Sequence, residues 1–446
     1  MQLLIPYLCL PFGKLMSNRR KIAFHTFGCK LNFAETSTIG RSLPEQGYEL
    51  VDHRERADIY VIHSCTVTEA AEKKCNQFIR RLKRGNPSSV IVVMGCYAEL
   101  KSRKLATMPE VDLVLGNESK YALAEHLRSL TAGSRFAVPE GSPESNPVFV
   151  PAFSLHDRTR SFLKVQDGCD NFCHYCIIPF VRGRSKSAPV RSVLESARMI
   201  HEAGVQEIVL TGVNIGDFGK HHGESLYDLL VQMEEQITVP RIRISSIEPD
   251  LLTNAIIHLV ASSGKIMPHF HIPLQSGSDR ILALMKRNYR RELFADRIAR
   301  IRSILPDSCI AVDVIVGFPG ETDADFTETI DFIQNTDLSY VHVFTYSERP
   351  GTVASRMENK IRPEIKKVRS QQLHVLSENK KKLFYHKNKG TTHQVLFESD
   401  PIKTELFGFT ENYIHVKAPY DQNLVNQIIP VKLIKLDENE FYDYEG

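Results

Sequence analysis

The sequence predicts an α/β protein in three parts: an N-terminal domain with a parallel sheet, a central partial (β/α)6 barrel and a small C-terminal β-barrel. Two observations lead to this fold class. Short apolar runs alternate with amphipathic stretches in two separate series, which is typical of parallel sheets covered by helices. After residue 389 this pattern stops, and short β-like runs with polar breaks replace it. The 446 residues are enough for roughly two to four domains.

The first 20 residues stand apart from these domains. The segment Leu3–Leu10 is apolar, but no basic residues precede it and Pro6 interrupts it, so we expect neither a signal peptide nor a membrane span. We expect residues 1–20 to be a leader or a disordered tail.

Hydrophobic residues make up 42% and charged residues 24% of the chain, as in average globular proteins. Nine cysteines without a secretory leader favour metal ligands or core residues over disulfides. A soluble, cytoplasmic protein with no membrane partner is therefore expected.

The first domain is expected at 21–132, where four apolar runs have strand-like sequence. These runs are Ile22–Phe27, Ile59–His63, Val90–Met94 and Val111–Leu115. A stretch rich in Gly, Ser and Pro follows, and its lack of any hydrophobic period predicts a linker at 133–155.

The second series, at 156–388, is expected to form the partial barrel. Its six predicted strands are Phe162–Val165, Glu207–Leu210, Arg241–Ser245, His269–Pro273, Ala311–Val316 and Tyr340–Thr345. Helices are expected between them, with Ser192 and Asp323 as N-caps of two. The last domain is expected at 389–446, and small β-barrels of its size commonly bind oligonucleotides. Its predicted strands are Gln394–Phe397, Tyr413–Val416 and Ile428–Leu436.

Three cysteines recur as C-x3-C-x2-C directly after the first barrel strand, in VQDGCDNFCHYCIIPFVRGRSKS. They are Cys169, Cys173 and Cys176. Three soft thiolates this close together favour an iron–sulfur cluster. Since a cubane cluster has four irons, three protein ligands leave one iron open to an external ligand, which is a catalytic feature. A structural zinc site is the alternative, but it normally closes with four ligands, and only His174 could complete it.

A second set of cysteines is spread along the first domain. Cys29, Cys65 and Cys96 each follow a small residue at the end of a predicted parallel strand. Parallel strands would bring the three thiols together at the carboxyl edge of the sheet, where open α/β sheets bind ligands. We therefore expect a shared second cluster, the alternative being three separate buried cysteines. Cys75 and Cys309 lie in apolar patterns and are expected in the core.

Glycine-containing loops and basic residues surround these cysteines. The loops LTGVNIG, HIPLQSGS and VIVGFPGE each follow a barrel strand, and glycines there allow a ligand to approach the backbone. Basic side chains can track a phosphate backbone, although such runs are more often a solvated face. They are Arg158, Arg160, Arg182, Arg184, Lys186, Arg191 and the stretch Lys380–Lys389.

With these residues in view, the chain resembles the radical-SAM methylthiotransferases over about Lys21–Leu436. The C-x3-C-x2-C loop matches the wide superfamily, and GCKLN at Gly28–Asn32 with IIPFVRGRSKS after the loop narrows the match. TFGCKLNFAET, LTGVNIGDFG and HIPLQSGSDR are most similar to the branch that acts on threonylcarbamoyladenosine (t6A37) beside the tRNA anticodon. Related branches modify isopentenyladenosine in tRNA or an aspartate of a ribosomal protein. A non-catalytic iron–sulfur protein that binds RNA is an alternative of another class.

The resemblance implies an enzyme with two [4Fe–4S] clusters and S-adenosylmethionine. The cluster at Cys169, Cys173 and Cys176 would bind and cleave S-adenosylmethionine, and the resulting 5′-deoxyadenosyl radical would take the hydrogen from adenine C2. The cluster at Cys29, Cys65 and Cys96 would present a methylated sulfur for insertion there. The C-terminal module would be an RNA-binding TRAM domain, and the partners would be tRNA, an electron donor and a sulfur source. By position, the residues implied in cofactor contact are Thr211, Gly212, Asn214, Ser245 and Gln275.

Overall fold

The computed structural model describes residues 19–130, 136–137, 148–155, 159–398, 404–437 and 440–444. The predicted leader lies almost wholly outside these ranges, and so does Arg158. Within the ranges, no helix combines the length and the apolar character needed to cross a membrane.

The N-terminal part is a parallel sheet of six strands in the order β2-β1-β3-β4-β5-β6. All four predicted strands are present, and β2 and β6 were missed because they are short edge strands. β6 also lies inside the stretch predicted as a linker. The strands are β1 (Arg20–Thr26), β2 (Tyr48–Val51), β3 (Ile59–Ser64), β4 (Val90–Gly95), β5 (Leu113–Leu115) and β6 (Phe136–Ala137).

Helices cover both faces of this sheet, which explains why its central strands read as unbroken apolar runs. Helices α1 (Lys30–Ser42) and α4 (Leu123–Ser129) share one core with the sheet. Helices α2 (Glu69–Gly85) and α3 (Cys96–Ala106) share the core on the other face, where Cys75 is fully buried as predicted.

The central part contains the six predicted parallel strands. They form two hydrogen-bonded sheets, β12-β11-β8 and β13-β14-β15, with the short β7 (Ala152–Phe153) added antiparallel to β8. Backbone bonds join the two sheets, for example from Ile247 N to His271 O at 3.0 Å. This is the expected partial barrel. Its strands are β8 (Ser161–Lys164), β11 (Glu207–Thr211), β12 (Arg241–Ile244), β13 (His269–Gln275), β14 (Cys309–Val316) and β15 (Tyr340–Thr345).

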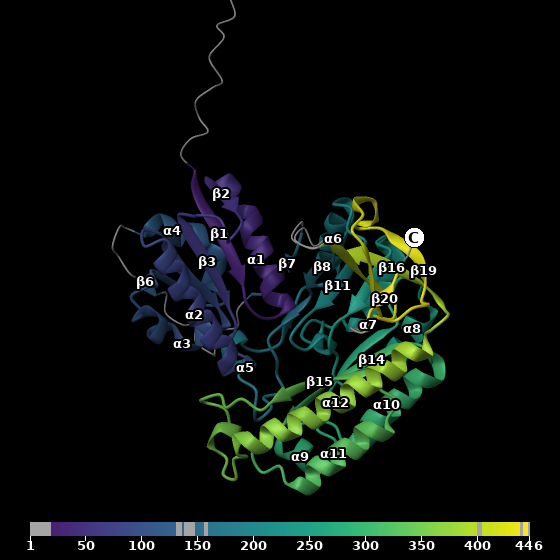
Figure 1. The fold of residues 1–446 in the computed structure, drawn as a ribbon. Coiled ribbons are helices and arrows are strands. Elements are labelled where there is room, and N and C mark those ends of the chain that lie inside the picture. Colours follow the sequence, from purple (N-terminus) through teal and green to yellow (C-terminus); the bar gives the residue numbers. More distant parts are fainter. Residues whose placement is uncertain are drawn as a thin grey trace, which may run out of the picture.

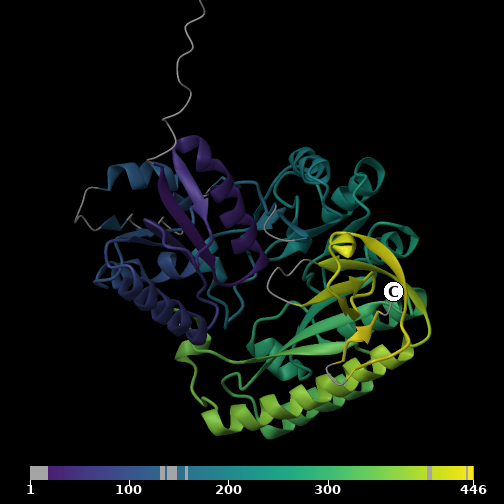
Figure 2. The same cartoon turned by 45° about the horizontal axis from the view of Figure 1, so that its top comes forward.

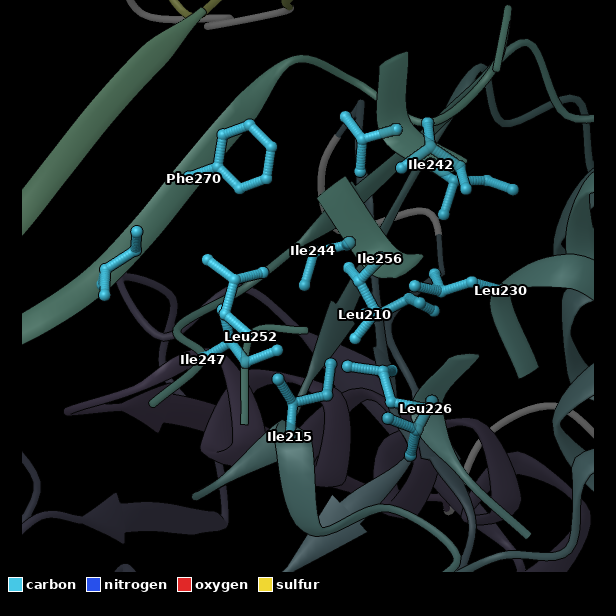
Figure 3. Close-up of a cluster of buried hydrophobic side chains, with 14 of the residues drawn as sticks. Leu210, Ile215, Leu226, Leu230, Ile242, Ile244, Ile247, Leu252, Ile256 and Phe270 are labelled. Carbon is cyan, nitrogen blue, oxygen red and sulfur yellow. The ribbon is translucent and has the colours of Figure 1, made fainter. Parts of the chain in front are cut away.

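The main core of the molecule lies between the barrel strands and the helices outside them. Figure 3 shows part of it, where Leu210, Ile242 and Ile244 from the strands gather with Leu230 and Ile256 from the helices. The helices are α6 (Val190–Glu202), α7 (Leu226–Gln236), α8 (Asn254–Ser262), α9 (Asp279–Leu284), α10 (Arg291–Ile304), α11 (Asp323–Asn335) and α12 (Pro363–Lys387).

Both predicted N-caps were wrong by one or more residues. Helix α6 begins directly after Pro189, whose ring fixes φ near the helical value. Helix α11 is capped by Thr322, which forms a capping box with Asp325. That reciprocal pair satisfies two backbone N–H groups, more than Asp323 alone would.

The C-terminal part is a curled sheet of five strands in the order β19-β16-β17-β18-β20. Its core also holds Phe384 and Tyr385 from α12 and Cys309 from β14, so the sheet packs against the barrel. Figures 1 and 2 both show it well apart from the N-terminal sheet, with α12 leading along the barrel to it. The strands are β16 (Thr392–Glu398), β17 (Glu405–Thr410), β18 (His415–Pro419), β19 (Ile428–Lys432) and β20 (Tyr442–Asp443).

Candidate functional site

The three cysteines of the first domain meet at the carboxyl edge of the N-terminal sheet. Cys29 precedes α1, Cys65 follows β3 and Cys96 begins α3, and β1, β3 and β4 are neighbours. Burial raises the pKa of the Cys65 thiol to about 11, and the thiols of Cys96 and Cys29 add to the rise. We call Cys29, Cys65 and Cys96 the sheet-edge triad.

A glycine makes room for this triad. Gly28 has a φ of +107°, and a Cβ at this position would lie 2.8 Å from the Cys65 Cβ. Any other residue would therefore be strained and would push against a cysteine of the triad.

The second set of cysteines lies in the loop after β8, and we call Cys169, Cys173 and Cys176 the barrel triad. Burial raises the pKa of Cys176 to about 12, with further contributions from the other two thiols. Hydrogen-bond donors point at the sulfur atoms. Arg287 Nη1 lies 3.2 Å from the Cys173 Sγ, and the Asn171 N–H donates to the Cys169 Sγ at 3.5 Å. Such donors favour thiolates, the form that binds a metal.

The donor atoms indicate what these triads can hold. All six cysteines are free thiols. Three thiol donors of this kind fit an iron–sulfur cluster, whereas a structural zinc site needs a fourth ligand. The Nδ1 of His174, the only candidate for a fourth zinc ligand, instead lies 2.8 Å from the Leu284 carbonyl.

A pocket of about 200 Å³ borders Cys176 of the barrel triad and the residues that follow Cys65 of the sheet-edge triad. Val67 and Thr68, which follow Cys65, form one wall, and Cys176 with its neighbours forms another. Asp313 and Gln275 add polar groups from the barrel strands. The apolar side chains of the lining are Val67, Tyr175, Ile177, Ile178, Ile315, Phe344 and Tyr346. A flat apolar ligand held here would lie against Cys176 of the barrel triad and against the loop that follows Cys65.

The five residues implied in cofactor contact all lie at the carboxyl ends of β11, β12 and β13. The Gln166 Oε1 accepts hydrogen bonds from the backbone of Val213 and Asn214 at 2.9 and 2.8 Å, and a Cβ at Gly212 would lie 2.8 Å from it. Thr211, the last residue of β11, is buried beside this turn. Gln166 was not singled out in the sequence.

Two of these residues have buried polar atoms that lack a partner. The Asn214 Oδ1 and the Ser245 Oγ make no hydrogen bond within the described structure. Gln275 has a φ of +64° at an irregularity of β13 and lines the pocket. Because buried polar groups are nearly always paired, the unpaired atoms indicate where a polar ligand fits.

A buried charge network joins the two triad loops. Glu35 on α1 accepts hydrogen bonds from Lys120 at 2.6 Å, Lys164 at 3.0 Å and Arg182 at 3.2 Å. Arg182 also bonds to Asn32 and Asp167, which lie close in sequence to Cys29 and Cys169. Burial alone would raise the pKa of Glu35, but the three cations outweigh it and hold the pKa well below its usual range. The network therefore sets how the two domains are placed.

A second polar cluster lines the inner face of the barrel. The His271 Nε2 lies 2.7 Å from the Asp313 Oδ1, and His342 on β15 lies beside this pair. Lys30, at the start of α1, approaches the same face from the N-terminal domain, since its charge lowers the pKa of His342 and of His269. Burial, and then the charges of Arg160 and Arg243, lower the pKa of Lys30 itself to about 8. We call Lys30, His271, Asp313 and His342 the inner polar cluster.

Most of the basic residues considered for phosphate contact form hydrogen bonds or ion pairs within the protein. Arg182 is buried in the charge network, and Arg160 pairs with Glu398 and Glu207. In the stretch Lys380–Lys389, Lys380 donates to backbone carbonyls, and ion pairs form to Glu440 and Asp307. Arg184 and Arg191 also have acidic partners, and Lys186 donates to the Arg182 carbonyl. The buried contacts of Arg160, Arg182 and Lys380 favour a structural role for these three residues, whereas Arg184 and Arg191 remain exposed.

Comparisons with known proteins match both parts that carry the triads. Residues 21–116 match the uncharacterized protein family UPF0004, and residues 163–333 match the radical SAM superfamily. The threonylcarbamoyladenosine tRNA methylthiotransferase MtaB of Bacillus subtilis is 39% identical over 427 residues, covering 93% of this chain and 94% of that protein. Its namesake in Thermotoga maritima is 38% identical over 424 residues, covering 94% and 95%.

A relative with a different substrate in its name is also similar. The tRNA-2-methylthio-N(6)-dimethylallyladenosine synthase of Syntrophus aciditrophicus is 34% identical over 368 residues, covering 81% of this chain and 80% of that protein. Among solved structures, the radical S-adenosylmethionine methyltransferase TsrM of Kitasatospora setae has a TM-score of 0.53 at 12% identity and covers 73% of each chain. That likeness supports the fold alone.

Proposed function

The chain belongs to the radical-SAM tRNA methylthiotransferases, and on that premise we propose that it inserts a methylthio group at C2 of threonylcarbamoyladenosine beside the tRNA anticodon. Relatives that carry this activity in their names are 33% to 39% identical over most of the chain. The observation that carries the proposal is the pocket lined by Cys176 of the barrel triad and by Val67 and Thr68, which follow Cys65 of the sheet-edge triad. Methylthio insertion needs hydrogen removal and sulfur supply at one carbon atom, and the lining of this pocket combines a barrel-triad cysteine with the loop that follows a sheet-edge cysteine.

Each triad would hold one [4Fe–4S] cluster, because three thiols leave one iron for another ligand. When bound, the two clusters and S-adenosylmethionine supply hydrogen-atom abstraction and a methylated sulfur. Asn214 and Ser245 would bind polar groups of S-adenosylmethionine through their unpaired oxygens. Thr211, Gly212 and Gln275 would shape the same edge of the barrel.

The apolar wall of the pocket would hold the adenine base. Phe344 and Tyr175 offer aromatic faces for stacking, and Ile177 beside the barrel triad excludes water. Arg287, which donates to the Cys173 Sγ and pairs with Glu248, would hold the cluster loop in place and balance its negative charge.

The remaining assignments follow from the family. The triad-bearing domain at 21–132 and the barrel at 156–388 would carry the chemistry, and the module at 389–446 would be a TRAM-like domain that contacts the RNA. The electron donor and the sulfur source would be separate partners in the cytoplasm.

Mass spectrometry of tRNA nucleosides tests the proposal. Cells without the gene should lose 2-methylthio-threonylcarbamoyladenosine and accumulate its unmodified precursor, and the purified, anaerobically reconstituted enzyme should convert one into the other. If the enzyme instead modifies only isopentenyladenosine RNA or a ribosomal protein, the substrate assignment is wrong. If it modifies nothing and never cleaves S-adenosylmethionine, the non-catalytic alternative holds.

A further inference from the structure

Lys30 is a partly buried cation whose charge the protein does not neutralise. Among the residues that the structure describes, no hydrogen bond or ion pair to its ammonium group is present, although buried charges are normally paired. Glu207 is the nearest carboxylate that stabilises its charge, but both oxygens of Glu207 are already bonded to Arg243 at 2.9 and 3.0 Å.

The surroundings of Lys30 carry excess positive charge. Arg160 and Arg243 face it, and His269 and His342 lie within the reach of its field. Such surroundings attract an anion. They also disfavour a divalent cation at His271, Asp313 and His342, even though the ligand atoms of these three residues lie within 4.8 Å of one another.

The inner polar cluster adjoins the pocket at Asp313. Asp313 belongs to both, since it lines the pocket and contacts His271. A base in the pocket could therefore extend a polar substituent past Asp313 toward His342 and Lys30.

The substituent of the proposed substrate carries groups that match this cluster. From the base outward, a threonylcarbamoyl group offers ureido N–H donors and then, on its threonine end, a carboxylate and a hydroxyl group. Asp313 is an acceptor for the N–H groups, and Lys30 is a donor for the carboxylate.

We propose that Lys30, together with His342, binds the carboxylate of the threonylcarbamoyl group and thereby selects this nucleoside over adenosines with an apolar substituent. This inference rests on the proposed function. An isopentenyl group would leave the ammonium group of Lys30 without a partner, and unpaired buried polar groups are a strong source of rejection.

Binding of three anticodon stem-loop RNAs tests the inference. The RNAs differ only at the target adenosine, which carries threonylcarbamoyl, its neutral methyl ester, or isopentenyl. The reconstituted wild-type enzyme should bind the carboxylate RNA about 10- to 100-fold more tightly than the ester RNA, as expected for a hydrogen bond to a charged group. Lys30→Met should bring this ratio close to one, and Lys30→Arg should retain most of it. His342→Gln should reduce the ratio partly.

Lys74→Met is the matched control, because Lys74 is an exposed lysine of the same domain. It should leave the ratio unchanged. Iron content and the circular dichroism spectrum of each variant establish that it is folded and loaded.

Three results would overturn the inference. Lys30→Met could keep the wild-type ratio, or it could weaken all three RNAs equally, which would make Lys30 a general phosphate contact. Discrimination by the wild type could also vanish on chelation of divalent cations, which would assign the histidines to a metal. Failure of the proposed function is recognised separately, because the wild-type enzyme would then not methylthiolate the threonylcarbamoyl RNA at all.

Discussion

Replacing Glu207 with Gln should loosen the C-terminal sheet from the barrel. Glu207 is fully buried and accepts two hydrogen bonds from Arg243, while Arg160 and Arg241 lie 3.6 and 3.7 Å from its carboxylate. The same arginines reach the C-terminal sheet. Arg241 donates to the Phe409 carbonyl at 3.0 Å, and Arg243 donates to the Glu411 carbonyl at 3.1 Å. One carboxylate thus holds the groups that bind the two parts together.

The pKa of Glu207 gives the size of the effect. Burial would raise this pKa, but the three arginines outweigh it and lower the pKa from 4.5 to about 2. That difference corresponds to about 3 kcal/mol of folding free energy at neutral pH. Because the pKa is lowered on folding, this stability is present above pH 4.5 and is lost as the pH falls toward 2. About 1 kcal/mol of it should be lost by pH 4.

Urea unfolding followed by far-UV circular dichroism measures the effect. Glu207→Gln should be about 3 kcal/mol less stable than wild type at pH 7.5, and this deficit should shrink at pH 4 because only the wild type loses the contribution of the carboxylate. Glu405→Gln is the control, since Glu405 is an exposed residue of β17. A deficit at pH 7.5 below about 1 kcal/mol, the range of exposed ion pairs, would refute the reasoning, and so would a deficit that does not change with pH.

Three further predictions concern the triads and the network between them. Replacing the whole barrel triad with Ala should halve the iron and sulfide bound after anaerobic reconstitution, and full iron content or one equivalent of zinc would contradict the cluster assignment. Replacing any cysteine of the sheet-edge triad with Ala should abolish sulfur insertion but leave reductive cleavage of S-adenosylmethionine. Loss of cleavage with an intact barrel cluster would disprove separate roles. After Glu35→Gln, Lys164 and Arg182 keep their pairs with Asp167 but Lys120 loses its ion pair, and the change should cost about 3–5 kcal/mol in urea unfolding. The exposed Glu69→Gln control should behave as wild type, and equal stability of the two variants would rule out the structural role of the network.

The sequence by itself predicted the buried central strands of the N-terminal sheet and the edge at which three cysteines gather. An apolar run such as Ile59–His63 is buried on both faces of a parallel sheet, so its composition alone marks it as a strand. Each cysteine of the sheet-edge triad follows such a strand. Since parallel strands end at one edge, sequence position was enough to predict that the three thiols meet.

Only the tertiary structure decided what the charged residues do. Arg182 was read as a candidate phosphate contact, yet it is buried between Glu35 and Asp167. In the sequence, Lys30 is only one letter of the GCKLN motif. Its lack of a counter-ion follows from the tertiary structure, which places it against the barrel. The reason is physical: hydrophobic periodicity is a local property of the chain, whereas the partner and burial of a long charged side chain depend on elements that lie more than a hundred residues away.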